Sequence, residues 1–407
     1  MWREEQNEIQ SFRTSAALIG VALALAVVLV PAVVVVVLAA PSARAQTYSV
    51  LYSFHGKHGS EPEAGLTQDK KGNLYGTTYG GGAYNEGTVF VLKANGKETV
   101  LHSFTGGADG AVPVAGLVRD SAGNLYGTTS SGPCQRCGVV FKVDKAGTET
   151  VLHSFGGGAD GAYPEAGLVR DSAGSFFGTT FFGGNKYHCG GNGCGTVFRL
   201  TADGKEKVLY SFTGKADGLY PVAGLVRDSA GNLYGTTGQG GASGAGVAFK
   251  VDKTGTETVL HSFTGGADGA VPFAGLVRDS AGNLYGTTWS GGAYKDGVVF
   301  TLDTTGAETV LYSFTGEADG AYPRAGLVRD SAGNLYGTTF YGGAYGAGVV
   351  FELDTTGAET VLHSFTGGAD GSKPFAGLVR DFAGNLYGTT SQGGAYGSGV
   401  VFKITPQ

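Results

Sequence analysis

The chain has 407 residues, of which 75 are glycine, and it carries a formal net charge of -6 at pH 7. Hydrophobic residues make up 42% and aromatic residues 11% of the chain. There is therefore ample apolar surface to bury, and the high glycine content indicates turns rather than disorder. No basic stripe is present, which argues against a nucleic-acid partner.

The N-terminal segment, residues 1–45, has the features of an export signal. It contains a long uncharged run of Ala, Val, Leu and Ile, interrupted by Pro31 and followed by Ala43-Arg44-Ala45, a cleavage-site pattern just before Gln46. The run is also long enough to span a bilayer, and the acidic start is unusual for a signal peptide. We predict a signal peptide, with a retained N-terminal membrane anchor as the alternative. Both place residues 46–407 outside the cytoplasm, as a secreted, periplasmic or cell-surface protein.

A unit of 51 residues then repeats seven times, with one six-residue insertion in the third unit. Ser-Phe pairs recur with the same period as a Gly-Thr-Thr triplet. The triplets begin at Gly76, Gly127, Gly178, Gly235, Gly286, Gly337 and Gly388.

Each unit contains four short segments with the patterning of β-strands. In the second unit they are Ala115–Asp120, Asn124–Thr129, Gly138–Asp144 and Thr148–Phe155, and the third alternates with period two. Two tight turns and two longer glycine-rich links connect the segments. Four antiparallel strands in a repeat of this length predict an all-β fold, a seven-bladed β-propeller of four-stranded blades.

The two ends of the repeat region complement each other. The chain finishes on Gly399–Thr405, a third strand without a fourth, and the region begins at Thr47–Phe54, a fourth strand without the preceding three. Together they would complete one blade, close the ring and remove the exposed sheet edge. We therefore expect a single propeller over residues 46–407.

Long strings recur almost unchanged, and GLVRDSAGNLYGTT stands intact at 116–129, 224–237, 275–288 and 326–339. Together with the Ser-Phe and Gly-Gly elements, this pattern resembles the bacterial GloVer (Gloeo_Verruco) tandem-repeat family over nearly the whole chain after residue 46. The resemblance implies a secreted or surface-displayed repeat protein of unassigned activity. It brings no catalytic residues to transfer to this chain.

The repeat separates structural residues from candidates for function, since a residue present in every unit is expected to support the blade. Aspartates that recur in the first turn and in the long link are therefore expected to cap those loops. A column in which His102, His153, His261 and His363 exchange with Tyr52, Tyr210 and Tyr312 is expected to serve packing.

The four cysteines break the repeat. Cys134 and Cys137 fall in the second unit, and Cys189 and Cys194 in the third, all in the link between the second and third strands. Export favours disulfides, and we prefer the pairs Cys134–Cys137 and Cys189–Cys194. Bridges between units and a four-cysteine zinc site remain alternatives.

Sequence variation gathers in the two long links, which should emerge on one face because the strands alternate in direction. Aromatic and charged residues there could bind a ligand at the mouth of the central channel. The candidates after Gly-Thr-Thr are Tyr79, Phe181, Trp289 and Phe340. Those after the proline of the other link are Glu63, Glu165, Phe273, Arg324 and Phe375.

We predict a non-catalytic extracellular binding propeller, a monomer without cofactor or metal, whose ligand is a carbohydrate, a peptide or another protein. Membrane contact is expected only if the N-terminal segment is retained. One alternative is a lyase or hydrolase at the channel mouth, with Glu63 and Glu165 as acid and base and Arg324 binding an anion. A purely structural surface protein is the other.

Overall fold

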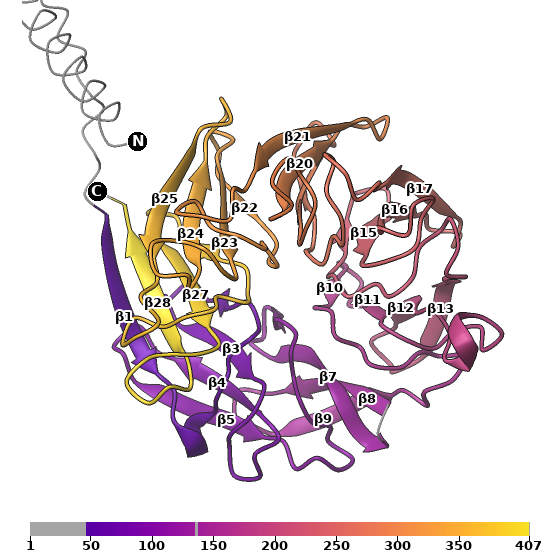
Figure 1. Cartoon of the computed structure of the whole chain (residues 1–407). Coiled ribbons are helices and arrows are strands. Elements are labelled where there is room, and N and C mark those ends of the chain that lie inside the picture. Colours follow the sequence, from indigo (N-terminus) through magenta and orange to yellow (C-terminus); the bar gives the residue numbers. More distant parts are fainter. Residues whose placement is uncertain (1–45, 135–136, 407) are drawn as a thin grey trace, which may run out of the picture. The chain divides into compact units, whose positions relative to one another are not determined.

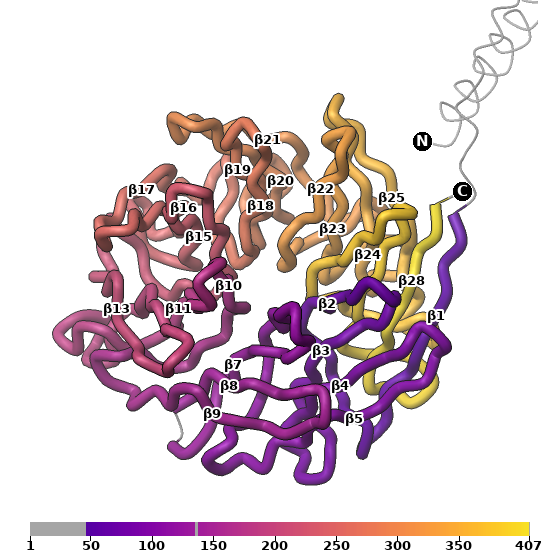
Figure 2. Tube along the Cα trace, turned by 180° about the vertical axis from the view of Figure 1, so that it is seen from behind, coloured from indigo at the N-terminus to yellow at the C-terminus, as the bar shows by residue number. Residues whose placement is uncertain are grey.

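The computed structural model describes residues 46–134 and 137–406, so the predicted signal peptide lies outside the described residues. Seven four-stranded antiparallel sheets stand in a ring around a central channel (Figure 1). This confirms the predicted seven-bladed propeller. In each blade the first strand lies nearest the channel and the last lies at the perimeter, as the trace seen from behind shows (Figure 2).

The strands fall into four classes by position in the blade. The inner strands are β2 (Thr67–Gln68), β6 (Val118–Arg119), β10 (Val169–Arg170), β14 (Val226–Arg227), β18 (Val277–Arg278), β22 (Val328–Arg329) and β26 (Val379–Arg380). The second strands are β3 (Leu74–Thr78), β7 (Leu125–Cys134), β11 (Phe176–Thr180), β15 (Leu233–Thr237), β19 (Leu284–Thr288), β23 (Leu335–Thr339) and β27 (Leu386–Thr390).

The other two classes form the outer half of each blade. The third strands are β4 (Thr88–Leu92), β8 (Cys137–Val143), β12 (Thr196–Leu200), β16 (Val247–Val251), β20 (Val298–Leu302), β24 (Val349–Leu353) and β28 (Val400–Thr405). The outer strands are β5 (Glu98–Ser103), β9 (Glu149–Ser154), β13 (Glu206–Ser211), β17 (Glu257–Ser262), β21 (Glu308–Ser313), β25 (Glu359–Ser364) and β1 (Thr47–Ser53). Two short 3-10 helices, η1 (Gly56–His58) and η2 (Cys189–Gly191), lie in links.

The ring is closed by the two ends of the described chain. Strand β1 pairs antiparallel with β28, from Thr47 opposite Thr405 to Ser53 opposite Val400, and so supplies the outer strand of blade 7 (Figure 1). Blade 7, the blade of the seventh unit, is therefore completed by β1, and the outer edge of β28 is not left unpaired. This confirms the closure expected from the sequence.

The inner strands are shorter than expected, two residues instead of the predicted six in the second unit. The segment before each inner strand instead bonds to a threonine of the preceding blade. The first threonine of each Gly-Thr-Thr donates its hydroxyl hydrogen to a carbonyl of the next blade, as Thr77 does to Ala115 at 3.2 Å. Seven such bonds run round the ring, and the last joins Thr389 to Ala64.

The hydrophobic core lies between neighbouring blades. At each seam a phenylalanine that directly follows one outer strand meets, edge to face, a phenylalanine from the third strand of the next blade, as Phe104 meets Phe141 with centroids 5.0 Å apart. Seven such pairs have centroids 5.0–5.3 Å apart. Edge-to-face pairing adds about 1 kcal/mol per pair to the burial of the rings.

Two glycines of the repeat are dictated by close approach. A Cβ at Gly76 would lie 2.8 Å from Cζ of Phe90, so the seam phenylalanine needs glycine in the second strand. A Cβ at Gly116 would lie 3.2 Å from the carbonyl oxygen of Gly65, its counterpart in the preceding blade. The inner strands therefore approach backbone to backbone around the channel.

The recurrent polar residues stabilise loops and seams. Asp120 accepts hydrogen bonds from the backbone N–H and side-chain amide of Asn124 and from the Tyr126 hydroxyl, as a turn cap. The interchange of His and Tyr in the outer strands has a cause beyond packing. Five of the seven side chains reach the link aspartate: His363 Nε2 lies 3.1 Å from Asp370 Oδ2, for example, and the Tyr210 hydroxyl donates to its own link aspartate at 3.0 Å.

Candidate functional site

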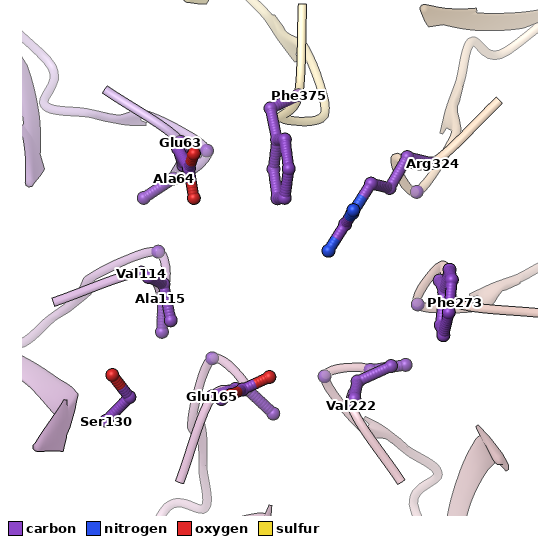
Figure 3. A pocket seen from close by; sticks show the side chains of 18 of the residues that line it. Glu63, Ala64, Val114, Ala115, Ser130, Glu165, Val222, Phe273, Arg324 and Phe375 are labelled. Carbon is purple, nitrogen blue, oxygen red and sulfur yellow. The ribbon is translucent and has the colours of Figure 1, made fainter. Parts of the chain in front are cut away.

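The links that carry the proline surround a cavity of about 500 Å³ at the end of the central channel, and the link between the second and third strands adds Tyr79, Ser130 and Ser131 to its wall. We call this cavity the mouth. All seven blades contribute to its wall through the residue that follows the link proline or through the Ala-Gly pair after it. Figure 3 shows Glu63, Val114, Glu165, Val222, Phe273, Arg324 and Phe375 in this order around the cavity.

The backbone that carries this ring of side chains is held in an unusual conformation. The residue before the link proline has a positive φ in every blade although it is never glycine, and φ is 56° at Tyr322. The backbone N–H of Tyr322 donates to the backbone carbonyl of Asp296 in the preceding blade. Its carbonyl accepts from the backbone N–H of Phe340 in its own blade. Because both bonds are made, the direction of Arg324, two residues later, is set by two blades.

Left-handed backbone at a non-glycine residue costs about 1–3 kcal/mol and persists only where the surroundings impose it. Here it recurs at seven positions with φ between 52° and 61°. The residues concerned are Glu61, Val112, Tyr163, Tyr220, Val271, Tyr322 and Lys373.

Arg324 is the cation of the mouth and lies among aromatic rings. Its guanidinium carbon is 3.9 Å from the ring centroid of Phe375, 5.3 Å from that of Phe273 and 5.9 Å from that of Trp289. Figure 3 shows its side chain extending into the cavity between the two phenylalanines. No carboxylate of the described residues lies within salt-bridge distance of it.

Glu63 and Glu165 are the anions of the mouth and come from blades 1 and 3. Burial raises the pKa of Glu63 to about 7, against the opposing effect of Arg324 and with the help of Glu61 and Glu165. Burial likewise raises the pKa of Glu165, and Arg324 again opposes it. Desolvation also lowers the pKa of Arg324, although both glutamates act in the other direction. The three charges therefore interact across the cavity without being paired in it.

Six of the nine residues proposed from the sequence line the mouth, namely Glu63, Tyr79, Glu165, Phe273, Arg324 and Phe375. The other three do not. Trp289 and Phe340 lie behind Arg324 and the phenylalanines, with their own centroids 5.8 Å apart. Phe181 stacks on Tyr220 at 4.5 Å, away from the cavity wall.

Sequence reasoning missed part of the wall. Ser130 and Ser131 line the mouth, and so do the Ala-Gly pairs of the inner segments. These pairs occur in every unit, and residues present in every unit were expected to support the blade and not to bind a ligand. Tyr163 also lines the cavity, and the aromatic character of the position before the proline could have indicated it.

The cysteines form two local disulfides, Cys134–Cys137 and Cys189–Cys194, which agrees with the preferred pairing. The first joins β7 to β8 in a register that extends beyond the usual Thr129 end of a second strand, which makes β7 longer than its counterparts. The second closes the loop that carries the insertion and η2. Both stiffen the links of blades 2 and 3.

Within residues 46–134 and 137–406, no group of three or more His, Cys, Asp or Glu side chains is arranged to hold a metal ion. In the same ranges no helix has the length and apolar character needed to cross a bilayer.

The sequence model of a family described as the Gloeobacter/Verrucomicrobia repeat matches this chain three times, over residues 37–191, 184–331 and 317–407. A search of curated proteins found no match.

Among solved structures, virginiamycin B lyase from Staphylococcus aureus is similar with a TM-score of 0.58 at 15% identity, over 89% of this chain and 99% of that one. The extracellular domain of a protein described as a one component system from B. thetaiotaomicron has a TM-score of 0.55 at 11% identity, over 89% of this chain and 42% of that one. At these identities the similarity demonstrates the propeller fold alone.

Proposed function

The chain belongs to the Gloeobacter/Verrucomicrobia repeat family, and we propose that it is an exported, non-catalytic binding protein whose ligand enters the mouth of the propeller. Its ligand carries both an anionic and a cationic group, as a short peptide with free termini does. A neutral carbohydrate would leave the charges of the mouth without partners.

The single observation that supports this proposal is the unpaired Arg324. It is flanked by Phe375 and Phe273 and faces the carboxylates of Glu63 and Glu165 across a cavity of about 500 Å³. A partly buried guanidinium is expected to have an anionic partner, and none lies within salt-bridge distance among the described residues. A ligand carboxylate would fill that role, while a ligand ammonium would meet Glu63 or Glu165.

The test is a peptide array with free and blocked termini, together with a glycan array, followed by calorimetry on the best binder. We expect binding that requires a free carboxylate, and Arg324→Gln should weaken it about tenfold or more. Arg324→Lys is the matched control, which keeps the charge but loses the flat contact with the rings. Blank arrays and blank pull-downs would overturn the binding proposal.

Catalysis is the second candidate, because burial raises the pKa of Glu63 to about 7, the range in which a carboxyl can exchange a proton at neutral pH. In a lyase or hydrolase Glu63 and Glu165 would act as acid and base, and Arg324 would bind the anion. Glu63→Gln distinguishes the two functions. It should abolish turnover by an enzyme while leaving a measurable affinity for substrate, and it should only alter affinity in a binding protein.

Export is part of the proposal and is supported by the two disulfides, which are typical of oxidising compartments. Fractionation of producing cells should recover the protein outside the cytoplasm, and sequencing of its N-terminus should begin at Gln46. A mature protein that still starts at Met1 and sediments with membranes would establish the anchor instead.

A further inference from the structure

Four tyrosines occupy the same position in the loop between the second and third strands of four blades. They are Tyr84 in blade 1, Tyr294 in blade 5, Tyr345 in blade 6 and Tyr396 in blade 7, and their exposed fractions are 61%, 60%, 67% and 66%. Blades 5, 6, 7 and 1 are consecutive in the closed ring (Figure 1). The four side chains therefore form one continuous series, which we call the tyrosine arc.

The loops that carry the arc share one backbone conformation. In each, the residue after the tyrosine has a positive φ, as Asn85 has 64° and Gly346 has 70°. The alanine before the tyrosine donates its N–H to the serine that ends the outer strand, as Ala344 does to Ser364 at 2.8 Å. The tyrosines are therefore presented on fixed supports, which limits the conformational entropy lost when a ligand binds.

The loops around the arc carry little charge. In blades 6 and 7 the tyrosine is flanked only by glycine, alanine and serine, and in blade 5 the adjacent Lys295 and Asp296 have opposite charges. In blade 1 a single acid, Glu86, follows Asn85. These loops therefore carry no run of like charges that would attract an anionic or a cationic polymer.

In blade 7 the arc borders an open groove. Tyr396 lines an open groove of about 420 Å³ with Tyr52, Ser53 and His55, and its ring centroid is 5.0 Å from that of His55. This groove combines a flat apolar ring with hydroxyl and imidazole groups that can make directed hydrogen bonds.

From these observations we propose that the tyrosine arc binds a neutral polysaccharide, with sugar units at intervals along one chain against the tyrosines of consecutive blades and the groove in blade 7 as the strongest subsite. A series of equal, regularly repeated platforms fits a ligand that is itself a repeating polymer. Each ring provides flat apolar area and a hydroxyl, the two features needed for the amphipathic surface of a sugar.

Native gels that contain one soluble neutral polysaccharide each provide the test. Hydroxyethyl cellulose, laminarin, dextran and glucomannan are the probes, and at least one should retard the purified protein. Because simultaneous contacts multiply, the variant with all four tyrosines changed to alanine should lose about 100-fold in affinity or more. Each single Tyr→Ala variant should lose a smaller part.

Blade 4 allows the opposite test, in which a tyrosine is added to the arc. Its loop has the same backbone, with φ of 77° at Gly244 and the bond from Ala242 to Ser262, but carries Ser243 in place of the tyrosine. Ser243→Tyr should extend the arc by one platform and increase retardation. Tyr187→Ala is the control, because this tyrosine is 84% exposed but lies in the insertion outside the arc.

Three results would overturn the proposal: no retardation by any of the four probes, retardation that survives the quadruple variant, or equal effects of Tyr187→Ala. A quadruple variant that loses only self-association, measured by sedimentation, would assign the arc to contacts between copies of the protein. The substituted side chains are mostly exposed, so unchanged thermal unfolding of the variants should exclude misfolding as the cause.

Discussion

The ring of Tyr48 stacks on the ring of His363, with centroids 3.8 Å apart and an interplanar angle of 9°. The Tyr48 hydroxyl also donates to the backbone carbonyl of Asp370 at 2.5 Å. Tyr48 belongs to the strand that closes the ring and occupies the position where the other six outer strands begin with glutamate. Strand β1, near the start of the described residues, thus contacts residues that follow it by more than 300 positions.

Tyr48→Ala should therefore destabilise the whole propeller. The stacked pair and the hydrogen bond are each worth about 1 kcal/mol, so we expect a loss of about 2 kcal/mol in the free energy of unfolding, measured in urea. Tyr48→Phe keeps the ring and should lose only about 1 kcal/mol. An alanine variant as stable as the parent would show that β1 contributes little to closure.

Glutamates at the starts of the other outer strands predict a dependence of stability on pH. For five of them burial, with a smaller effect of the nearest link aspartate, raises the pKa to about 7. They are Glu149, Glu206, Glu257, Glu308 and Glu359. One carboxylate oxygen of each is buried without a hydrogen-bond partner among the described residues.

A raised carboxyl pKa means that the folded state holds protons more tightly than the unfolded state between pH 4.5 and about 7. The melting temperature should therefore fall as the pH rises through this window. Burial lowers the pKa of His153 and His363, which opposes this trend, but only at two sites. Changing all five glutamates to glutamine should flatten the fall. A melting temperature that instead rises from pH 5 to 7.5 would contradict the prediction.

The repeat made the fold predictable from the sequence. Period-two segments, tight turns and complementary ends defined the blades and the closing strand β1, because each is a local pattern copied seven times. The length of the inner strands was not predictable. The segment before the inner strand bonds to the preceding blade, as Ala115 does to Thr77, and contacts between blades leave no trace in the periodicity of a single unit.

The candidate site was predictable in part for the same reason. Comparing equivalent positions among units identified Glu63, Glu165 and Arg324, which line one cavity. It also selected Trp289 and Phe340, which vary equally but lie behind the wall. Variation between units marks a face of the propeller, whereas the direction of each side chain is set by contacts such as that of Arg324 with Phe375.

The disulfide pairing can be checked without a structure. Peptide mapping of the unreduced protein should recover Cys134 linked to Cys137 and Cys189 linked to Cys194. Any peptide that joins blade 2 to blade 3, or four free thiols released by a zinc chelator, would contradict this pairing. Because each bridge closes a loop of only a few residues, replacing one pair by serines should reduce the free energy of unfolding by about 2 kcal/mol.

The titration of Glu63 provides a direct test of the electrostatics of the mouth. Its carboxyl is held neutral up to a pKa of about 7 by burial and by the nearby carboxylates, and Arg324 acts against them. Removing the guanidinium with Arg324→Gln should therefore raise the pKa further. Removing a negative neighbour with Glu165→Gln should lower it.

Carbon-13 NMR of glutamate carboxyl groups across the pH range would measure both shifts, and the signal lost in Glu63→Gln would assign the resonance. If neither substitution moves that resonance, the three side chains do not share a cavity in solution, and a single ligand cannot bridge them. If both shifts occur in the expected directions, a ligand that brings a carboxylate to Arg324 should itself raise the pKa of Glu63. The affinity of a ligand that contacts only Arg324 should then increase as the pH falls below 7. The affinity of a ligand whose ammonium group binds the Glu63 carboxylate should instead decrease.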